Sequence, residues 1–283
     1  MLIPVDDPDD ERLAVFRLNE RQLSNRLQRR NDDGEGLFMA EGDLVVERAL
    51  EAGCEPVAAL VDRHRPPPVT SVLLEVAPVY AGGERVRALV TKLGVPNSVV
   101  AIFHRPPRSS VEALADGAHR LVLVEAVDNP ANIGAVVRNA AGLGWDGLII
   151  DNTSADPLAR RSLRVSMGHA LVLPHARTTD VVATIAHLAR SGFIIAALTP
   201  DAEATDIDDI GRTGLDNIDT NGTVGRVDTS DRLVVCMGAE RVGLSSEVIA
   251  AATLRVRIPM HRGVDSLNVA AATAIVCHAL RRR

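Results

Sequence analysis

Apolar and polar positions along the second half of the chain follow patterns typical of strands and helices in turn. Continuous apolar runs indicate strands that are buried on both faces, as in a parallel sheet. These runs occupy 121–127, 147–151, 171–173, 193–198 and 233–237. Segments with helical periodicity occur near 133–143, 179–191 and 266–281. Strands that alternate with helices predict a parallel, doubly wound α/β domain.

The first hundred residues carry a separate, smaller pattern. Apolar residues at helical spacing, with arginines between them, predict a helix over 12–30. A short strand at 37–42 leads into a helix at 43–52, and 57–61 is a second strand. Helix and strand signals alternate as far as residue 103, which predicts a small α/β domain.

Two segments interrupt these patterns and mark the domain organisation. Residues 104–110 contain two adjacent prolines, which hold a chain extended. We therefore expect an N-terminal domain over 1–105, a linker over 106–118 and a second domain over 119–283. Residues 200–230 are rich in Asp, Thr, Gly and Asn and poor in large apolar residues, so we expect a flexible insertion there.

The net charge of the chain is unfavourable for a nucleic-acid enzyme, but the type of its positive residues is favourable. The formal net charge is −6, whereas phosphate contacts need cations. Lys92 is the only lysine, so nearly all positive charge is carried by arginine, whose forked guanidinium binds phosphate in a bidentate manner. The acidic residues gather at the N-terminus and within 201–219. Arginine elsewhere therefore remains available for phosphate.

Several classes of protein are disfavoured by composition. The acidic N-terminus does not resemble a signal peptide, and no apolar stretch reaches the roughly 20 residues of a membrane span. We expect a soluble, cytoplasmic protein. The three cysteines are scattered, and the eight histidines do not group with carboxylates at ligand spacing, so we expect neither a disulfide framework nor a metal site.

Three polar or glycine-rich turns follow apolar runs in the second domain. The first is Asn129–Gly134 running on to Arg138, the second is Met237–Ser245, and the third is Ile258–Met260 followed by Ser266–Ala270. Ligands of open α/β sheets gather at the carboxyl ends of the strands. We therefore expect the three turns to converge on one pocket.

The residue types in these turns suit the binding of a charged ligand. Asn132 and Gly134 stand at a helix entrance, where free N–H groups favour anions, although Asn129 is equally suited to a purely structural N-cap. Gly238 allows close backbone approach. Ser266 is expected to cap the last helix.

In this order, the three stretches closely resemble the motifs of the SpoU/TrmH family of RNA 2′-O-methyltransferases, part of the SPOUT superfamily, over residues 119–283. The resemblance implies a SPOUT-type parallel-sheet domain with a C-terminal trefoil knot, S-adenosylmethionine as the methyl donor, and a homodimer. The pattern around Leu37–Gly42 is similar to the small RNA-binding domain of many family members. Arg241 stands where the family usually has glycine.

The resemblance also assigns roles to individual residues. A group of polar residues matches the family's catalytic positions: Asn132, Arg138, Glu240, Ser266 and Asn268. Residues at the ends of apolar runs are expected to bind the methyl donor: Leu198, Thr199, Gly238, Ile258, Met260 and Leu267. An arginine-rich segment is expected to contact RNA phosphates through Arg160, Arg161 and Arg164.

The expected function is methyl transfer from S-adenosylmethionine to a ribose 2′-hydroxyl, with ribosomal RNA favoured because of the extra N-terminal domain. Transfer RNA and a non-catalytic RNA-binding or assembly role, with a relic donor pocket, are the alternatives. A dinucleotide enzyme is disfavoured because the first turn lacks a G-x-G-x-x-G fingerprint. Arg138 acts either as the base or as an electrostatic stabiliser, and the sequence leaves this open.

Overall fold

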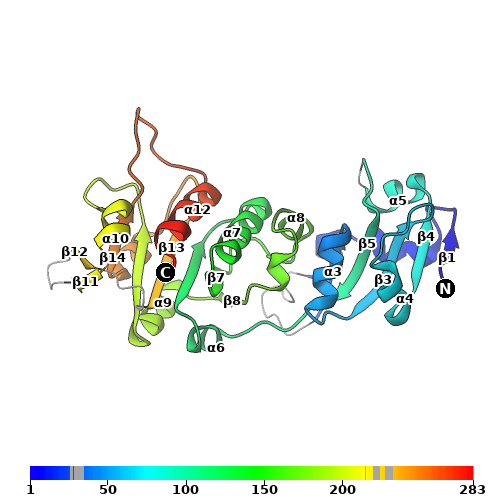
Figure 1. Ribbon diagram of the computed structural model, residues 1–283, viewed down its shortest axis with the longest axis horizontal. Helices are drawn as coiled ribbons and strands as arrows, with labels where there is room; N and C mark the ends of the chain where they lie inside the picture. The colour runs from blue at the N-terminus through cyan, green and yellow to red at the C-terminus, as the bar shows by residue number, and fades with distance from the viewer. Residues whose placement is uncertain are drawn as a thin grey trace. The chain divides into compact units, whose positions relative to one another are not determined.

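The computed structural model describes residues 1–25, 28, 35–92, 94–213, 215–218, 224–226 and 232–282. The chain divides into two compact units (Figure 1). The first unit contains Met1–Arg108 and Asp156–Val172, and the second contains Ser109–Ala155 and Leu173–Arg283. Segment 156–172, which the sequence placed in the second domain, therefore packs with the first unit.

The first unit is built on a five-stranded mixed sheet with the order β1-β4-β3-β5-β2, in which β5 runs antiparallel to both of its neighbours. The strands are β1 (Ile3–Val5), β2 (Leu37–Glu41), β3 (Pro56–Asp62), β4 (Val79–Gly82) and β5 (Val99–His104). The helices are η1 (Glu11–Arg17), α1 (Glu20–Leu23), α3 (Asp43–Glu51), α4 (Thr70–Val76), α5 (Glu84–Thr91), α8 (Arg160–Val165) and η2 (His169–Leu171). One core, which includes Leu13, Phe16, Leu60 and Ile102, joins η1 to the sheet.

Two predictions for this unit were wrong. The helix expected over 12–30 is divided into η1 and α1, because the side chain of Asn19 caps α1 in a capping box with Gln22. Residues 26–27 and 29–30 of that prediction lie outside the described residues. The strand expected at 171–173 is replaced by η2, which starts after Gly168 at a φ of +82°.

The second unit is built on a seven-stranded parallel sheet with the order β10-β14-β9-β13-β6-β7-β8, which confirms the predicted parallel α/β fold. The strands are β6 (Arg120–Glu125), β7 (Gly147–Asp151), β8 (His175–Thr178), β9 (Phe193–Leu198), β10 (Thr205–Asp206), β13 (Arg232–Gly238) and β14 (Leu254–Arg257). The helices are α6 (Val111–Asp116), α7 (Pro130–Gly142), α9 (Val181–Arg190), α10 (Ile207–Thr213), α11 (Ser246–Ala251) and α12 (Val269–Ala279). The interiors of the central strands β6 and β13 are apolar and buried, as such a sheet requires, and their polar residues stand at the strand ends.

The predicted insertion over 200–230 is partly regular structure. Residues 205–206 form the edge strand β10, and α10 follows with Ile207 and Ile210 buried. Two further short strands, β11 (Leu215–Ile218) and β12 (Val224–Arg226), pair antiparallel. The expectation of a flexible segment was therefore wrong for its first half, because two isoleucines three residues apart bury one face of a helix turn. Residues 219–223 and 227–231 lie outside the described part.

The last helix, α12, is fixed to the rest of the second unit by side chains that donate to its carbonyl groups. Trp145 Nε1 donates to Cys277 O at 3.0 Å, and the buried guanidinium of Arg120 donates through Nε to Leu280 O at 2.9 Å. These bonds satisfy carbonyls that a helix end leaves without intrahelical partners. Because α12 is held at its far end, the position of its N-terminus is determined by the sheet.

Candidate active site

The first turn connects β6 to α7 and is shaped by two polar side chains. Asn129 is the N-cap of α7, since its Oδ1 accepts a hydrogen bond from Ala131 N at 2.9 Å. The preceding Ala126 adopts a φ of +58°, and its N–H donates to Asp151 Oδ1 at 3.1 Å. Burial raises the pKa of Asp151, but hydrogen bonds from Ser154 and Thr153 lower it. Together, the hydrogen bonds outweigh the effect of burial, so the net shift of the pKa is downward. The turn is thereby held by an ionised carboxylate at the end of β7.

The second turn follows β13 and folds back tightly on itself. A Cβ at Gly238 would lie 2.0 Å from the carbonyl carbon of Gly243, so only glycine fits. Gly243 has a φ of +72°, and its N–H donates to Ala239 O at 2.8 Å. Gly238, which the sequence singled out, and Gly243 are therefore both needed for the shape of this loop.

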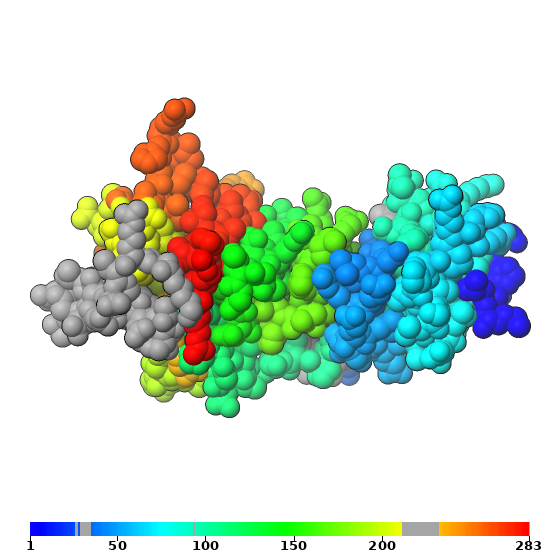
Figure 2. Space-filling model, in the orientation of Figure 1, coloured from blue at the N-terminus to red at the C-terminus, as the bar shows by residue number. Residues whose placement is uncertain are grey.

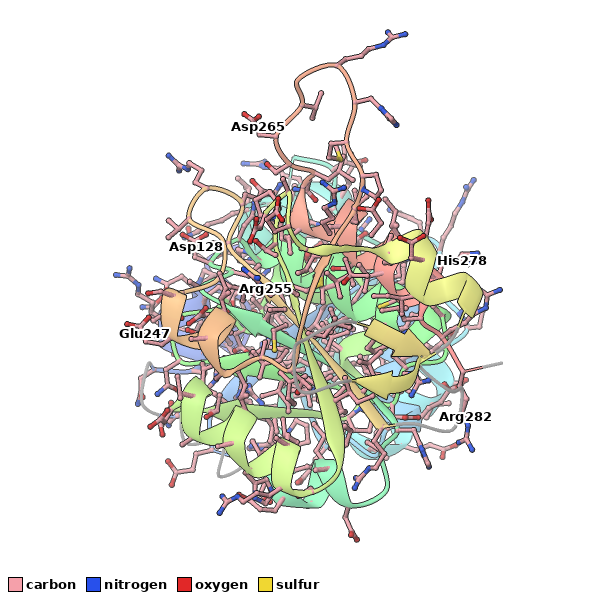
Figure 3. All side chains as sticks on the ribbon, turned by 90° about the vertical axis from the view of Figure 1, so that its left-hand side faces the viewer. Asp128, Glu247, Arg255, Asp265, His278 and Arg282 are labelled. Carbon is pink, nitrogen blue, oxygen red and sulfur yellow. The ribbon has the colours of Figure 1, made fainter. Side chains whose placement is uncertain are left out.

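The third segment runs from the end of β14 to the start of α12 and projects from the surface of the second unit (Figure 2). Residues 261–266 are all exposed, and Figure 3 labels Asp265 near the tip. The cap of α12 is Asn268, whose Oδ1 accepts from Ala270 N at 2.9 Å. The prediction that Ser266 caps this helix was wrong, because the helix starts two residues later than expected.

Three side chains, one from each segment, meet in a hydrogen-bonded cluster of Asn132, Glu240 and Asn268. Asn132 Nδ2 donates to Glu240 Oε1 at 2.8 Å, and Asn268 Nδ2 donates to Asn132 Oδ1 at 3.2 Å. Asn268 Nδ2 also donates to Glu240 Oε1. The structure thus brings together residues up to 136 positions apart in the sequence. A carboxylate that accepts from two amides fixes the orientation of both, which is what a binding site for sugar hydroxyls requires.

Two of the predicted catalytic residues lie outside this cluster. Arg138 is exposed and makes no hydrogen bond or ion pair within the described part of the chain. It follows Asn132 by six residues, which rotates it by about 240° around the axis of α7. Asn139, nearly aligned with Asn132, instead faces α12 and donates to Ala270 O at 2.7 Å. Ser266 lies in the exposed loop.

Most of the residues predicted to bind the methyl donor lie at or just after the carboxyl ends of three adjacent strands, and Leu267 lies just before α12. β14, β9 and β13 are neighbours in the sheet; Leu198 and Gly238 end their strands, and Ile258 follows the third. All six predicted residues are half-buried: Leu198, Thr199, Gly238, Ile258, Met260 and Leu267. A partly open, mainly apolar edge with backbone N–H and C=O groups suits an adenine ring and its polar rim.

The arginine-rich segment lies in α8 of the first unit, and its three members differ in environment. Arg160 is bound through Nε to Glu41 Oε1 at 2.9 Å and through Nη2 to Thr91 O at 3.2 Å. Arg164 lies 3.4 Å from the same, fully buried carboxylate but is half-exposed, whereas Arg161 is exposed. The sequence missed Glu41, although a glutamate at the end of an apolar strand is itself a signal of a buried ion pair.

A second buried ion cluster in the first unit involves residues of the predicted linker. Asp156 pairs with Arg105 at 2.9 Å and with Arg108 at 3.1 Å, and all three side chains are at most 8% exposed. Burial raises the pKa of Asp156, but the charges of the two arginines lower it far more, to well below its ordinary value. The segment that the sequence identified as an extended linker is therefore partly fixed in place.

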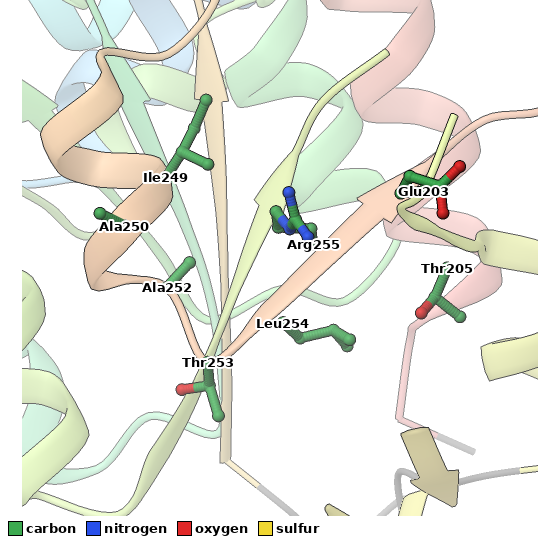
Figure 4. Close-up of a pocket in the computed structure, with 8 residues that line it drawn as sticks. All are labelled: Glu203, Thr205, Ile249, Ala250, Ala252, Thr253, Leu254 and Arg255. Carbon is green, nitrogen blue, oxygen red and sulfur yellow. The ribbon is translucent and has the colours of Figure 1, made fainter. Parts of the chain in front are cut away.

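A pocket of about 370 Å³ lies near the start of β14, away from the residues that follow the end of that strand (Figure 4). It is lined by Glu203, Thr205, Ile249, Ala250, Ala252, Thr253, Leu254 and Arg255. Arg255 is paired with Asp201 at 2.8 Å. None of the predicted site residues lines this pocket.

The described residues contain no group of three or more His, Cys, Asp and Glu side chains that could hold a metal ion. Among them, no helix is long and apolar enough to cross a membrane. The three cysteines are free and buried, and burial raises their pKa values, to about 11 for Cys54 and about 12 for Cys236 and Cys277.

Comparisons with known proteins agree with the motif pattern. Residues 119–278 match the SpoU rRNA Methylase family. An uncharacterized tRNA/rRNA methyltransferase of Mycobacterium tuberculosis is 38% identical over 272 residues, which cover 95% of this chain and 88% of the relative. The 23S rRNA (guanosine(2553)-2′-O)-methyltransferase RlmP of Bacillus subtilis is 26% identical over 86% of this chain and 88% of its own length.

Solved structures show the same fold over nearly the whole chain. The AdoMet-bound rRNA methyltransferase from Sinorhizobium meliloti has a TM-score of 0.76 and 26% identity, and the match covers 99% of this chain and 98% of that one. The SpoU methyltransferase AviRb from Streptomyces viridochromogenes, in complex with AdoMet, has a TM-score of 0.73 over 96% of this chain and 97% of that one. At 23% identity, the second match supports the fold alone.

Proposed function

Since the chain belongs to the SpoU rRNA methylase family, we propose that it transfers a methyl group from S-adenosylmethionine to a ribose 2′-hydroxyl of ribosomal RNA. The observation that carries this proposal is the cluster of Asn132, Glu240 and Asn268, which joins the three motif segments. The likeness to RlmP, a 2′-O-methyltransferase of 23S rRNA, supports the ribose as the site of methylation.

The methyl donor is assigned to the edge formed by the ends of β9, β13 and β14. The AdoMet-bound relative supports this cofactor, and the half-buried residues at this edge fit it. When bound, S-adenosylmethionine supplies an electrophilic methyl group on its sulfonium. The backbone at Gly238, Ile258 and Leu267 would hold the cofactor, with Met260, Leu198 and Thr199 beside it.

The cluster would position the ribose. Glu240 accepts a hydrogen bond from the amides of Asn132 and Asn268, so neither amide is free to rotate. Asn132 keeps a second N–H and both asparagines keep acceptor capacity, which suit hydroxyl groups that both donate and accept. Preorganised polar groups of this kind lower the cost of orienting a substrate.

Arg138 would bind the phosphate next to the target ribose and stabilise the negative charge that develops on its oxygen. A guanidinium holds its proton above a pKa of about 12, so we assign it this electrostatic role rather than that of a base. The phosphate or water would take the proton of the hydroxyl.

A homodimer would complete the site. Arg138 lies on a different face of α7 from Asn132. Ile275 is exposed on α12, a helix that is apolar on most sides. We therefore propose that the α7–α12 face pairs with a second copy, so that Arg138 of one copy serves RNA bound at the other.

Two further features are proposed from the family. The chain around 238–245 and 258–268 would form the trefoil knot, with α12 tucked through; the close approach of Gly238 and Gly243 and the anchoring of α12 support this. The first unit would bind RNA in the cytoplasm through Arg161 and Arg164, with Arg160 orienting α8 through Glu41.

The test is a transfer assay with tritiated S-adenosylmethionine on RNA from a strain that lacks the gene. Ribosomal and transfer RNA are assayed separately, followed by mapping of 2′-O-methyl sites. We expect label in ribosomal RNA with the wild type. With Arg138→Lys we expect methyl transfer to fall about 100-fold or more, because the point charge of an ammonium cannot reproduce the bidentate contact of a guanidinium with phosphate. Arg190→Lys, an exposed arginine on α9, serves as the matched control. Label in transfer RNA alone, or in neither RNA, would overturn the assignment.

A further inference from the structure

Glu125, the last residue of β6, contacts both ends of the loop that carries Glu240. Its backbone lies opposite Gly238 in the β6–β13 ladder, where the loop begins. Its carboxylate accepts hydrogen bonds from Ser245 N to Oε2 and from Ser245 Oγ to Oε1, both at 2.8 Å, where the loop ends. One residue of the first motif strand therefore closes the loop of the second motif.

The loop between these two ends has little conformational freedom. Ala239 and Gly243 pair with each other, and the backbone of Gly243 packs so closely against Gly238 that no side chain fits between them. Ser245 also caps α11, since its Oγ accepts from Val248 N at 3.4 Å. A displacement of Ser245 would therefore be passed on to Gly243 and Gly238 rather than absorbed.

The middle of the loop carries Glu240, which makes the hydrogen bonds of the candidate site. Glu240 accepts hydrogen bonds from Asn132 on α7 and Asn268 at the start of α12. No hydrogen bond within the described residues joins Glu125 itself to any of these three side chains. Whatever Glu125 contributes to the site is thus exerted through the loop.

We propose that Glu125 is a positioning residue for the methyl donor: its carboxylate holds the 238–245 loop in the shape that presents the backbone of Gly238 to the cofactor. The proposal rests on the function proposed above, in which Gly238 lies against S-adenosylmethionine. A carboxylate suits this task because one oxygen accepts from the backbone N–H and the other from the hydroxyl, whereas a neutral amide offers only one oxygen for the two contacts.

The competing explanation is that Glu125 only stabilises the fold, as a carboxylate staple, meaning a carboxylate that holds backbone segments together by accepting two hydrogen bonds. The second unit offers a matched control for this explanation. Asp146 accepts hydrogen bonds from His119 N at 2.7 Å and Arg120 N at 2.8 Å, at the opposite end of the same strand β6. Asp146→Ala removes the same kind of carboxylate staple on the same strand, remote from the carboxyl ends where the donor is expected. It should lower the unfolding temperature without changing the affinity for the donor.

The experiment measures the Kd of the full-length protein for S-adenosylmethionine and S-adenosylhomocysteine by isothermal titration, well below the unfolding temperature of each variant. Because hydrogen bonds to charged groups are the stronger ones, Glu125→Ala should weaken binding about tenfold. Glu125→Gln and Ser245→Ala should each weaken it by about threefold, since each keeps one of the two contacts. The effects of Glu125→Ala and Ser245→Ala should be less than additive in the double variant.

A second readout separates positioning from general damage. With RNA saturating, the KM for the donor should rise more than kcat falls in Glu125→Gln, which retains the size of the side chain. Wild-type affinity in both Glu125 variants would overturn the inference and leave the proposed function intact. Equal weakening by Asp146→Ala would also overturn it, since the staple would then be merely structural. If the wild type binds neither compound, the proposed function falls together with the inference.

Discussion

Asn268 has two roles that can be separated by two substitutions. Its Oδ1 caps α12 by accepting from Ala270 N, and its Nδ2 donates to Glu240 and to Asn132. Serine is as good an N-cap as asparagine but is too short to supply the amide donor. Asn268→Ser should therefore keep the cap and lose the cluster, whereas Asn268→Ala should lose both.

The magnitudes follow from the two contacts. Loss of an N-cap costs about 1 kcal/mol, which corresponds to about 3 °C in the unfolding temperature for a domain of this size. A hydrogen bond to a carboxylate contributes about 1.5 kcal/mol at the lower end of its range, which suits an exposed Glu240 and corresponds to about tenfold in kcat/KM.

Thermal unfolding and transfer of a tritiated methyl group should be measured on the same preparations. We expect Asn268→Ser to unfold near the wild-type temperature with about tenfold lower transfer, and Asn268→Ala to show both losses. Asp180→Ala is the control, because Asp180 caps α9 through Ala183 N at 2.9 Å and lies outside the cluster. Full transfer by Asn268→Ser would refute the role of the amide, and equal stability of the two variants would refute the cap.

Three further predictions test the loop, the buried ion cluster and the thiols. Gly238→Ala should abolish donor binding, measured by titration, because its Cβ would meet the backbone of Gly243 at 2.0 Å; retained binding would contradict the close approach. Asp156→Asn should lower the free energy of unfolding by about 3–5 kcal/mol at pH 7 in urea, because two buried arginines lose their counter-charge. The folded pKa of Asp156 is depressed, so its contribution is complete above the unfolded pKa of about 4 and is lost as the pH falls through the folded value; the gap between wild type and variant should shrink below pH 4, and a constant gap would exclude this explanation. The cysteines should resist iodoacetamide at pH 8 until urea is added, because burial raises the pKa of each thiol; rapid labelling of the native protein would show that they are accessible.

The sequence predicted the elements that have a strong apolar pattern and misjudged those whose ends depend on capping residues or on distant partners. The strand at Phe193–Leu198 was predicted with its observed ends, because a strand buried on both faces is apolar at every position. The break between η1 and α1 depends on the capping box of Asn19, a short-range signal that the periodicity of the apolar residues concealed. Both Ser266 and Asn268 are suitable caps, and the structure uses Asn268, which also contacts Glu240 and Asn132 from distant parts of the chain.

The candidate site shows the same division. The three motif segments could be recognised from their order, but the contacts of Glu240 with Asn132 and Asn268 join positions 108 and 28 residues away from it. Arg160 was grouped with Arg161 and Arg164 because they are close in sequence, whereas its guanidinium is bound to Glu41, 119 positions away. A run of like charges in a sequence therefore does not distinguish an arginine that is committed to a buried carboxylate from one that is free to meet a phosphate.

The cluster is positioned by parts of the second unit that lie outside the three motif turns. α12 is held at its far end by Trp145 and Arg120, so its first residue, next to the cap Asn268, has a defined place at the edge of the sheet. Glu240 is brought to the same place by a loop that closes on Glu125. A carboxylate between two amides keeps this geometry only if the elements that carry the three side chains are rigid. Exposed side chains would otherwise exchange these hydrogen bonds for bonds to water. The distant anchors are therefore as much a condition of the site as the polar side chains that form it.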